Sequence, residues 1–166
     1  MSRSGYSEYD GGDAYDDLRA AGWAANVRRC MRGRAGQAFL WELYQSLEAL
    51  PSKRLIQHSL EARGEYCALG AVALSRGIEI PAELRATDDE ADDWDDEGTY
   101  EVMGKLLRVK ELLAREIMWQ NDDCDDVHDV EGPAQAWCSG PSRYDSPEER
   151  WQRMREWVVS KLAGTP

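Results

Sequence analysis

The amino-acid sequence predicts a mainly α-helical fold, a single compact domain of about five helices. Apolar side chains recur every three or four positions in several segments, which is the spacing of one face of a helix. Glycine or proline follows several of these segments, as expected at helix ends. A chain of 166 residues can bury roughly two-thirds of its unfolded surface in one domain. We therefore expect a flexible polar arm at residues 1–12 and one helical domain at residues 13–166.

Two helices are expected at the start of this domain. Asp13 can cap a helix that continues to about Met31. After a break at Gly33, a second helix is expected over about Ala35–Leu50, where Pro51 ends it. This second helix has the clearest apolar face in the first half of the chain, formed by Phe39, Leu40, Leu43, Tyr44, Leu47 and Leu50.

The stretch that follows is open to two interpretations. Arg63 and Gly64 can form the tip of a small hairpin within Leu55–Cys67. Alternatively, Lys53–Glu61 can form a helix with its leucines facing inward. We favour a helix or an irregular turn first and a brief pair of strands after it.

Three further helices are expected downstream. The small residues of Ala68–Arg76 favour a helix, and Gly77 suits its C-terminal cap. Thr99–Trp119 carries apolar side chains at helical spacing and is expected to form one continuous helix. The last helix has the best-marked start, because Ser146 and Glu149 have the spacing of a capping box. Its apolar face comprises Trp151, Met154, Val158 and Leu162.

Charge is distributed very unevenly along the chain. Residues 1–80 carry ten acidic and ten basic side chains, whereas residues 81–166 carry twenty-two and ten, so the second half holds the whole net charge of −12. Two acidic loops are expected, at residues 87–97 and 121–143, on either side of the fourth helix. A strongly negative surface repels nucleic acid and membranes and attracts basic proteins or cations. We therefore expect a partner protein with a basic surface, and neither direct nucleic-acid binding nor membrane association.

The candidate partner-binding surface consists of the acidic residues in these loops and two nearby tryptophans. Carboxylates beside a helix can imitate the phosphate spacing that DNA-binding clefts recognise. Tryptophan is a residue type that anchors protein interfaces. The predicted partner-binding residues are Asp88, Asp89, Glu90, Asp92, Asp93, Trp94, Asp95, Asp96, Glu97, Trp119, Asp122, Asp123, Asp125 and Asp126.

The same acidic loops do not match a metal-binding motif. An EF-hand loop that began at Asn121 would require glycine at its sixth position, where Asp126 stands, and an acid at its twelfth, where Gly132 stands. Cys124 and His128 lack the closely spaced ligand pairs that are typical of tetrahedral zinc sites. We therefore predict no metal and no cofactor, and weak cation association stays the alternative.

No catalytic constellation is recognisable, so the protein is not expected to be an enzyme. The only basic cluster comprises Arg28, Arg29, Arg32 and Arg34, next to a glycine-containing helix start that lacks the lysine of a phosphate-binding loop. This cluster is open to three interpretations: it pairs with the acidic loops, it contacts a second copy of the chain, or it holds a phosphate. The longest apolar run, Cys67–Leu74, is eight residues, which is too short to span a membrane. A cytoplasmic location with free thiols is expected.

Four stretches together resemble small uncharacterised proteins of tailed bacteriophages and bacterial prophages. They are Arg32–Ile56 (RGRAGQAFLWELYQSLEALPSKRLI), Gly64–Ile78 (GEYCALGAVALSRGI), Leu112–Asp123 (LLAREIMWQNDD) and Ser146–Val158 (SPEERWQRMREWV). The family has no assigned activity, so no site residue is carried over from it.

The resemblance implies an accessory protein in the cytoplasm of a bacterial host, because small acidic phage proteins often bind host proteins, including defence machinery. Our leading hypothesis is a non-enzymatic protein that binds and inhibits a nucleic-acid-handling host protein through its acidic, DNA-like surface. A structural or assembly protein that acts by self-association is the first alternative. A metal-dependent enzyme or sensor is the second.

Overall fold

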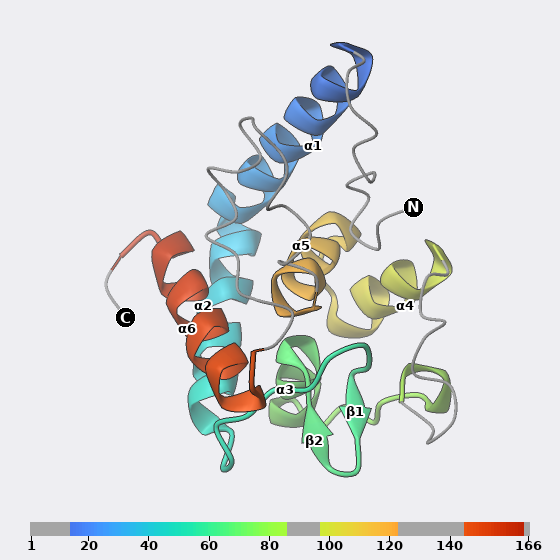
Figure 1. Ribbon diagram of the computed structural model, residues 1–166, viewed down its shortest axis with the longest axis vertical. Helices are drawn as coiled ribbons and strands as arrows, with labels where there is room; N and C mark the ends of the chain where they lie inside the picture. The colour runs from blue at the N-terminus through green and yellow to red at the C-terminus, as the bar shows by residue number, and fades with distance from the viewer. Residues whose placement is uncertain (1–13, 86–96, 123–144, 165–166) are drawn as a thin grey trace.

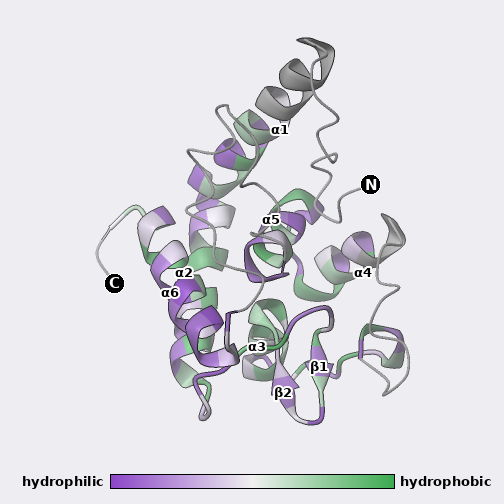
Figure 2. Ribbon diagram, in the orientation of Figure 1, coloured by the Kyte–Doolittle hydropathy of each residue, from purple (hydrophilic) through white to green (hydrophobic). Residues whose placement is uncertain are grey.

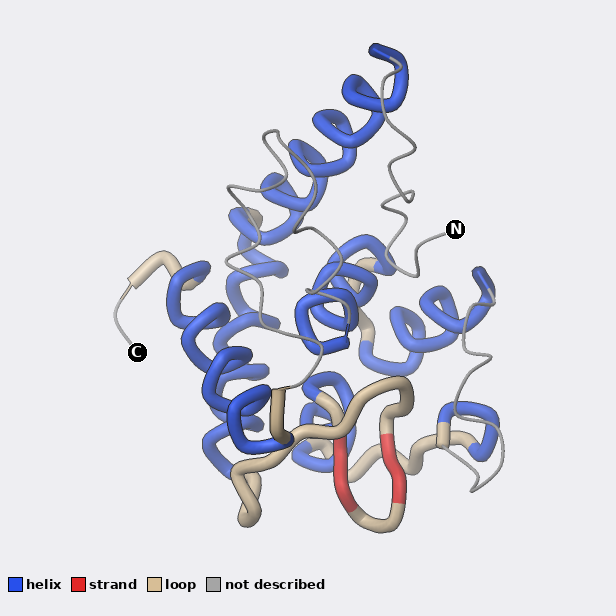
Figure 3. The backbone as a smooth tube through the Cα atoms, in the orientation of Figure 1, coloured by secondary structure: helices blue, strands red, loops and turns tan. Residues whose placement is uncertain are grey.

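The computed structural model describes residues 14–85, 97–122 and 145–164 (Figure 1). Within these residues the chain forms six α-helices and one two-stranded antiparallel sheet (Figure 3). The prediction of a mainly helical domain with one small hairpin is confirmed. The elements are α1 (Ala14–Arg32), α2 (Arg34–Ala49), β1 (Glu61–Ala62), β2 (Glu65–Tyr66), α3 (Ala68–Ser75), a 3-10 turn (Ala82–Leu84), α4 (Glu97–Leu107), α5 (Glu111–Asp122) and α6 (Pro147–Lys161).

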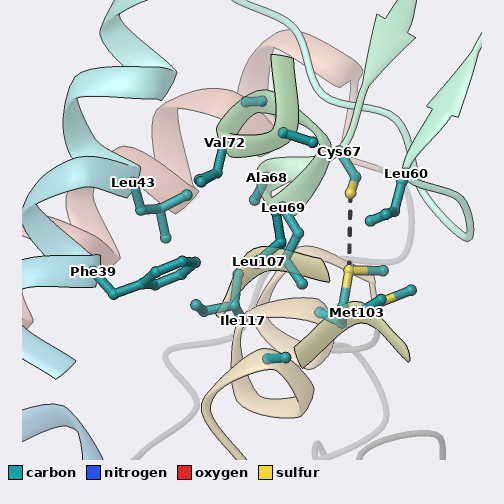
Figure 4. Packing of buried hydrophobic residues seen from close by; sticks show 14 of the residues in the cluster. Phe39, Leu43, Leu60, Cys67, Ala68, Leu69, Val72, Met103, Leu107 and Ile117 are labelled. Carbon is teal, nitrogen blue, oxygen red and sulfur yellow. Dashed lines mark hydrogen bonds between the residues drawn. The ribbon is translucent and has the colours of Figure 1, made fainter. Parts of the chain in front are cut away.

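The core is organised around α3, which packs against both α2 and α5. Six consecutive α3 residues, from Ala68 to Ala73, are buried, and the helix is largely green in the hydropathy view (Figure 2). A helix that is apolar on all sides must be covered on all sides. Figure 4 shows the side chains that converge on it: Phe39 and Leu43 from α2, Leu107 from α4 and Ile117 from α5.

The hairpin has the tip that the sequence predicts. Arg63 and Gly64 have φ angles of 54° and 78°, and a two-residue type I′ turn requires positive φ at both positions. The alternative helix over Lys53–Glu61 is wrong. Its backbone N–H groups bond to distant parts of the chain instead of to the preceding turn: Leu55 N donates to Pro147 O, Ile56 N to Tyr66 O and Leu60 N to Leu84 O.

The single helix predicted over Thr99–Trp119 is also wrong, because the chain turns between α4 and α5. Arg108 adopts the left-handed conformation, with a φ angle of 51°. The N–H of Val109 donates to Gly104 O at 2.9 Å, and the N–H of Arg108 donates to Lys105 O at 3.2 Å. These two bonds form a Schellman cap, a helix end that usually has glycine at the left-handed position. The carbonyl of Lys110 then accepts the first hydrogen bonds of α5.

Arg108 is therefore expected to strain this turn, and glycine should relieve the strain. We expect Arg108→Gly to raise the free energy of unfolding by about 0.5–1 kcal/mol, because the arginine is exposed and occupies a conformation that favours glycine. Gly77, which closes the corresponding cap after α3 with a φ angle of 63°, provides the matched comparison. Gly77→Ala should lower stability by about 1 kcal/mol in the same urea titration. A loss of stability in Arg108→Gly would contradict this account.

The last helix starts as the sequence predicts. The N–H of Glu149 donates to Ser146 Oγ at 3.2 Å, and the N–H of Ser146 donates to Glu149 Oε2 at 2.8 Å. This reciprocal pair lowers the pKa of Glu149 below its usual value. Met154 and Val158 of the predicted apolar face are fully buried. None of the described helices combines the length and the apolar content needed to cross a bilayer.

Candidate functional site

The predicted partner-binding surface falls mostly outside the described residues. Glu97 is the first residue of α4, and Asp122 is the last residue of α5. Trp119 is 5 % exposed, so its ring offers almost no surface to a partner. The predicted residues outside the described part are Asp88, Asp89, Glu90, Asp92, Asp93, Trp94, Asp95, Asp96, Asp123, Asp125 and Asp126.

The described residues and the rest of the chain differ sharply in net charge. The described residues carry seventeen acidic and eighteen basic side chains, a net charge of +1. The other residues carry fifteen acidic and two basic side chains, a net charge of −13, which accounts for the −12 of the chain. The described residues are therefore nearly neutral, and the acidic excess belongs to the residues outside them.

The described chain that leads into the first acidic run (Thr87–Glu97) is fixed against the irregular segment before β1. The N–H of Leu60 donates to Leu84 O at 3.1 Å. The next residue on each side forms an ion pair, with 3.2 Å between Arg85 Nε and Glu61 Oε2. The same two residues, Glu61 and Arg85, also pair as a parallel β-bridge. The backbone at residue 85 is thereby held in register with residue 61.

The second acidic run (Asn121–Glu131) begins against the same irregular segment. Asn121 is fully buried, and its Nδ2 donates to Ile56 O at 2.8 Å. Gln57 Nε2 donates to Asp122 O at 3.2 Å. We call Ile56–Glu61 the anchoring segment, because one end contacts Asn121 and Asp122, where the second run begins, and the other contacts Arg85, two residues before the first run. Gln57 and Glu61 are four residues apart, which corresponds to at most about 14 Å of extended chain.

Two arginines of α6 hold the places where the chain leaves the described structure after residue 122 and re-enters it at residue 145. Arg153 forms an ion pair with Asp145, at 2.9 Å between Nε and Oδ2, and also donates to the carbonyls of Gln120 and Asn121 at the end of α5. Arg150 is 4 % exposed and donates to Leu55 O at 2.7 Å and Asp145 O at 3.0 Å. Burial lowers the pKa of Arg150, and nearby Asp122 offsets part of that shift.

The buried thiol of Cys67 has a structural role. Cys67 Sγ caps α3 by accepting a hydrogen bond from Gly70 N at 3.3 Å. Burial raises the pKa of the Cys67 thiol to about 12, so the sulfur stays protonated and is a poor nucleophile at neutral pH. No cluster of three or more histidine, cysteine, aspartate or glutamate side chains suited to a metal lies among the described residues.

The anchoring contacts were not predicted from the sequence. Asn121 follows the apolar stretch of α5 as one more polar residue of an acidic run, and nothing in the sequence indicates that it is fully buried. Arg150 and Arg153 give a weak signal. Arg150 lies four residues before Met154, and Arg153 lies one residue before it, so both are beside the apolar stripe of α6. A long side chain at such a position can reach a neighbouring element.

No protein family, no curated protein and no solved structure matches this chain. The resemblance to phage and prophage proteins stays a prediction from the sequence.

Proposed function

We propose that the protein is a non-enzymatic phage or prophage accessory protein that binds and inhibits a nucleic-acid-handling host protein in the bacterial cytoplasm. The observation that supports this proposal is that one anchoring segment contacts both Arg85, two residues before the first acidic run, and Asp122 in the second. Together the runs hold fourteen acidic residues and no lysine or arginine. Contacts made by two residues at most about 14 Å apart, Gln57 to Asp122 and Glu61 to Arg85, favour one shared acidic surface over two separate ones.

Electrostatics explains why such a surface suits this class of partner. Clefts that bind DNA or RNA are lined with lysine and arginine, which accelerate the approach of a negatively charged partner. An acidic surface can occupy such a cleft and exclude the nucleic acid, which is inhibition by DNA mimicry. Arg85 and Asp122 are held by contacts within the described residues, and fixed attachment points of this kind reduce the entropic cost of binding.

Capture from a bacterial lysate tests the proposal directly. The tagged protein is used as bait at about 0.1 M and about 0.5 M salt, where the screening length falls from about 10 Å to about 4 Å. We expect mass spectrometry to identify a basic, nucleic-acid-handling protein that is retained at low salt and lost at high salt. Self-association that salt leaves unchanged, with no such partner, would instead indicate an assembly role.

Neutralising the first acidic run should weaken this binding at least ten-fold. The variant replaces Asp88, Asp89, Asp92, Asp93, Asp95 and Asp96 with asparagine, and affinity for the captured partner is measured by titration calorimetry. A matched control removes the same charge from exposed glutamates of the described residues: Glu79, Glu83, Glu101, Glu111, Glu148 and Glu156, each changed to glutamine. An equal loss of affinity in both variants would show that binding depends only on net charge. An unchanged affinity in the first variant would show that this run is not part of the interface.

A further inference from the structure

A second charged surface, of opposite sign, lies at the joint between α1 and α2. From Gly22 to Trp41 the chain carries four arginines and no acidic residue. Arg28, Arg29 and Arg32 line a shallow hollow together with Ala25 and Gly33. The basic surface consists of three exposed arginines, Arg29, Arg32 and Arg34.

The joint that carries these arginines is rigid. Gly33 alone separates the two helices, and its N–H donates to Arg29 O at 3.1 Å. A Cβ atom at Gly36 would lie 1.9 Å from Cys30 O, so the two backbones are in direct contact there. Gln37 Nε2 donates to Met31 O at 2.8 Å and to Lys161 O at 3.0 Å, which ties the end of α1 to the end of α6. The arginine backbones are therefore held in place before any ligand binds.

These three arginines differ from most others in the fold, which are paired. Arg76, for example, makes a bidentate contact with Glu42 at 2.6 Å, and this contact lowers the pKa of Glu42. Within the part of the chain that the structure describes, the basic surface forms no hydrogen bond or ion pair through its side chains. Its guanidinium groups can therefore bind an external anion without first breaking an internal contact.

An exposed aromatic side chain continues this surface along α2. Trp41 is 40 % exposed and stacks on Tyr44, with 5.6 Å between ring centroids and 28° between ring planes. Arg34, Ala38 and Trp41 are all exposed and follow the i, i+4, i+7 spacing of one helix face. Arg34 and Trp41 are separated by about 10.5 Å of helix rise.

We propose that the basic surface and Trp41 bind a short segment of single-stranded nucleic acid. Single-strand sites combine arginines that neutralise phosphates with aromatic faces on which unpaired bases stack. A duplex offers no free base face to Trp41, and an acidic peptide has no aromatic base to stack there. This inference is independent of the proposed function.

Our expectation of no direct nucleic-acid binding came from the charge of the whole chain. The described residues sum to +1, however, and charges separated by more than about 8 Å are largely screened at physiological salt. A basic surface on this frame can therefore attract phosphates although the whole chain is acidic.

Fluorescence anisotropy with labelled dT15 tests the proposal on the full-length protein. Binding is expected at about 50 mM salt and should weaken as salt rises. Arg29→Gln with Arg32→Gln should flatten the slope of log K against log salt by about 1.4, since each phosphate contact to a single strand contributes about 0.7. Trp41→Ala should raise the Kd about 5- to 150-fold, which is the effect of losing one stacked base.

The matched control removes two positive charges elsewhere. Arg108 and Lys110 are exposed and form no side-chain ion pair among the described residues, so Arg108→Gln with Lys110→Gln changes net charge equally. This control should leave the Kd for dT15 within about two-fold. Circular dichroism of each variant confirms that it is folded.

Several outcomes would overturn the inference. One is that dT15 does not bind at about 50 mM salt. Another is that the two charge variants lose affinity for dT15 equally. A third is that a 15-base-pair duplex binds more tightly than dT15. Binding of a poly-glutamate peptide that is as tight as dT15 and insensitive to Trp41→Ala would assign the surface to an acidic protein. The variant in which six aspartates of the first acidic run are changed to asparagine should bind dT15 at least as tightly as the wild type. Loss of partner binding in that variant therefore tests the proposed function, whereas binding of dT15 tests the basic surface.

Discussion

Replacing Gly70 with alanine is expected to lower the free energy of unfolding by more than about 4 kcal/mol, which is a large part of the roughly 5–15 kcal/mol that stabilises a typical domain. Gly70 lies in α3 where the helix touches the anchoring segment. A Cβ atom there would lie 1.9 Å from Leu60 O and 2.9 Å from Leu60 C, and both atoms belong to the backbone. No side-chain rotation relieves such a contact, so α3 or the anchoring segment would have to move. Urea unfolding followed by circular dichroism measures the loss.

The same substitution at Gly22 provides the control. Gly22 is exposed on α1, and a Cβ atom there meets nothing within 4 Å. Alanine is the better helix former, so Gly22→Ala should raise stability by about 0.5–1 kcal/mol. If Gly70→Ala unfolded at the urea concentration of the wild type, the close contact of α3 with Leu60 would be refuted.

Replacing Asn121 with alanine is expected to cost about 3 kcal/mol. The side chain is fully buried and bonds two backbone groups from different parts of the chain, accepting from Ala68 N at 3.1 Å and donating to Ile56 O at 2.8 Å. Alanine would leave both groups buried without a partner, and each such group costs about 1–3 kcal/mol. The N–H of Ala68 lies at the N-terminus of α3 and has no partner within its own helix.

Asn26→Ala is the matched comparison for this substitution. Asn26 is exposed on α1, so its replacement by a better helix former should change stability by less than about 0.5 kcal/mol. Thermal unfolding at one protein concentration compares both variants with the wild type. A stable Asn121→Ala variant that still bound its partner normally would show that the anchoring segment does not depend on this residue.

The parts of the fold that could be predicted are those in which local signals agree. α2 has a continuous apolar face and was predicted to within one residue at each end, and the capping box predicted the start of α6. The break between α4 and α5 was missed because Arg108 occupies a left-handed position where the sequence offers no glycine. The sequence left the segment after α2 open between a helix and an irregular turn, since its backbone groups bond across the chain to residues such as Tyr66 and Leu84.

The candidate site likewise combines features that the sequence reveals with contacts that only the structure shows. The acidic runs are visible in the sequence because composition alone reveals a charge excess. The contacts that fix their starts are not visible, since Asn121 and Ile56 are separated by 65 positions and nothing local marks them as partners. The basic surface was noticed as a cluster, but only the structure shows that Arg29, Arg32 and Arg34 stay exposed on a rigid joint.

Arg153 has a consequence for how this protein can vary in evolution. One side chain bonds both the end of α5 and Asp145, so the distance between these two points is set by the fold and not by the 22 residues that connect them. The entropy of closing such a connection depends only weakly on its length, at about 0.6 kcal/mol for each doubling. Insertions and deletions between residues 123 and 144 should therefore be inherited at little cost. The described part of the fold can then keep its shape while the length and the charge of this connection vary.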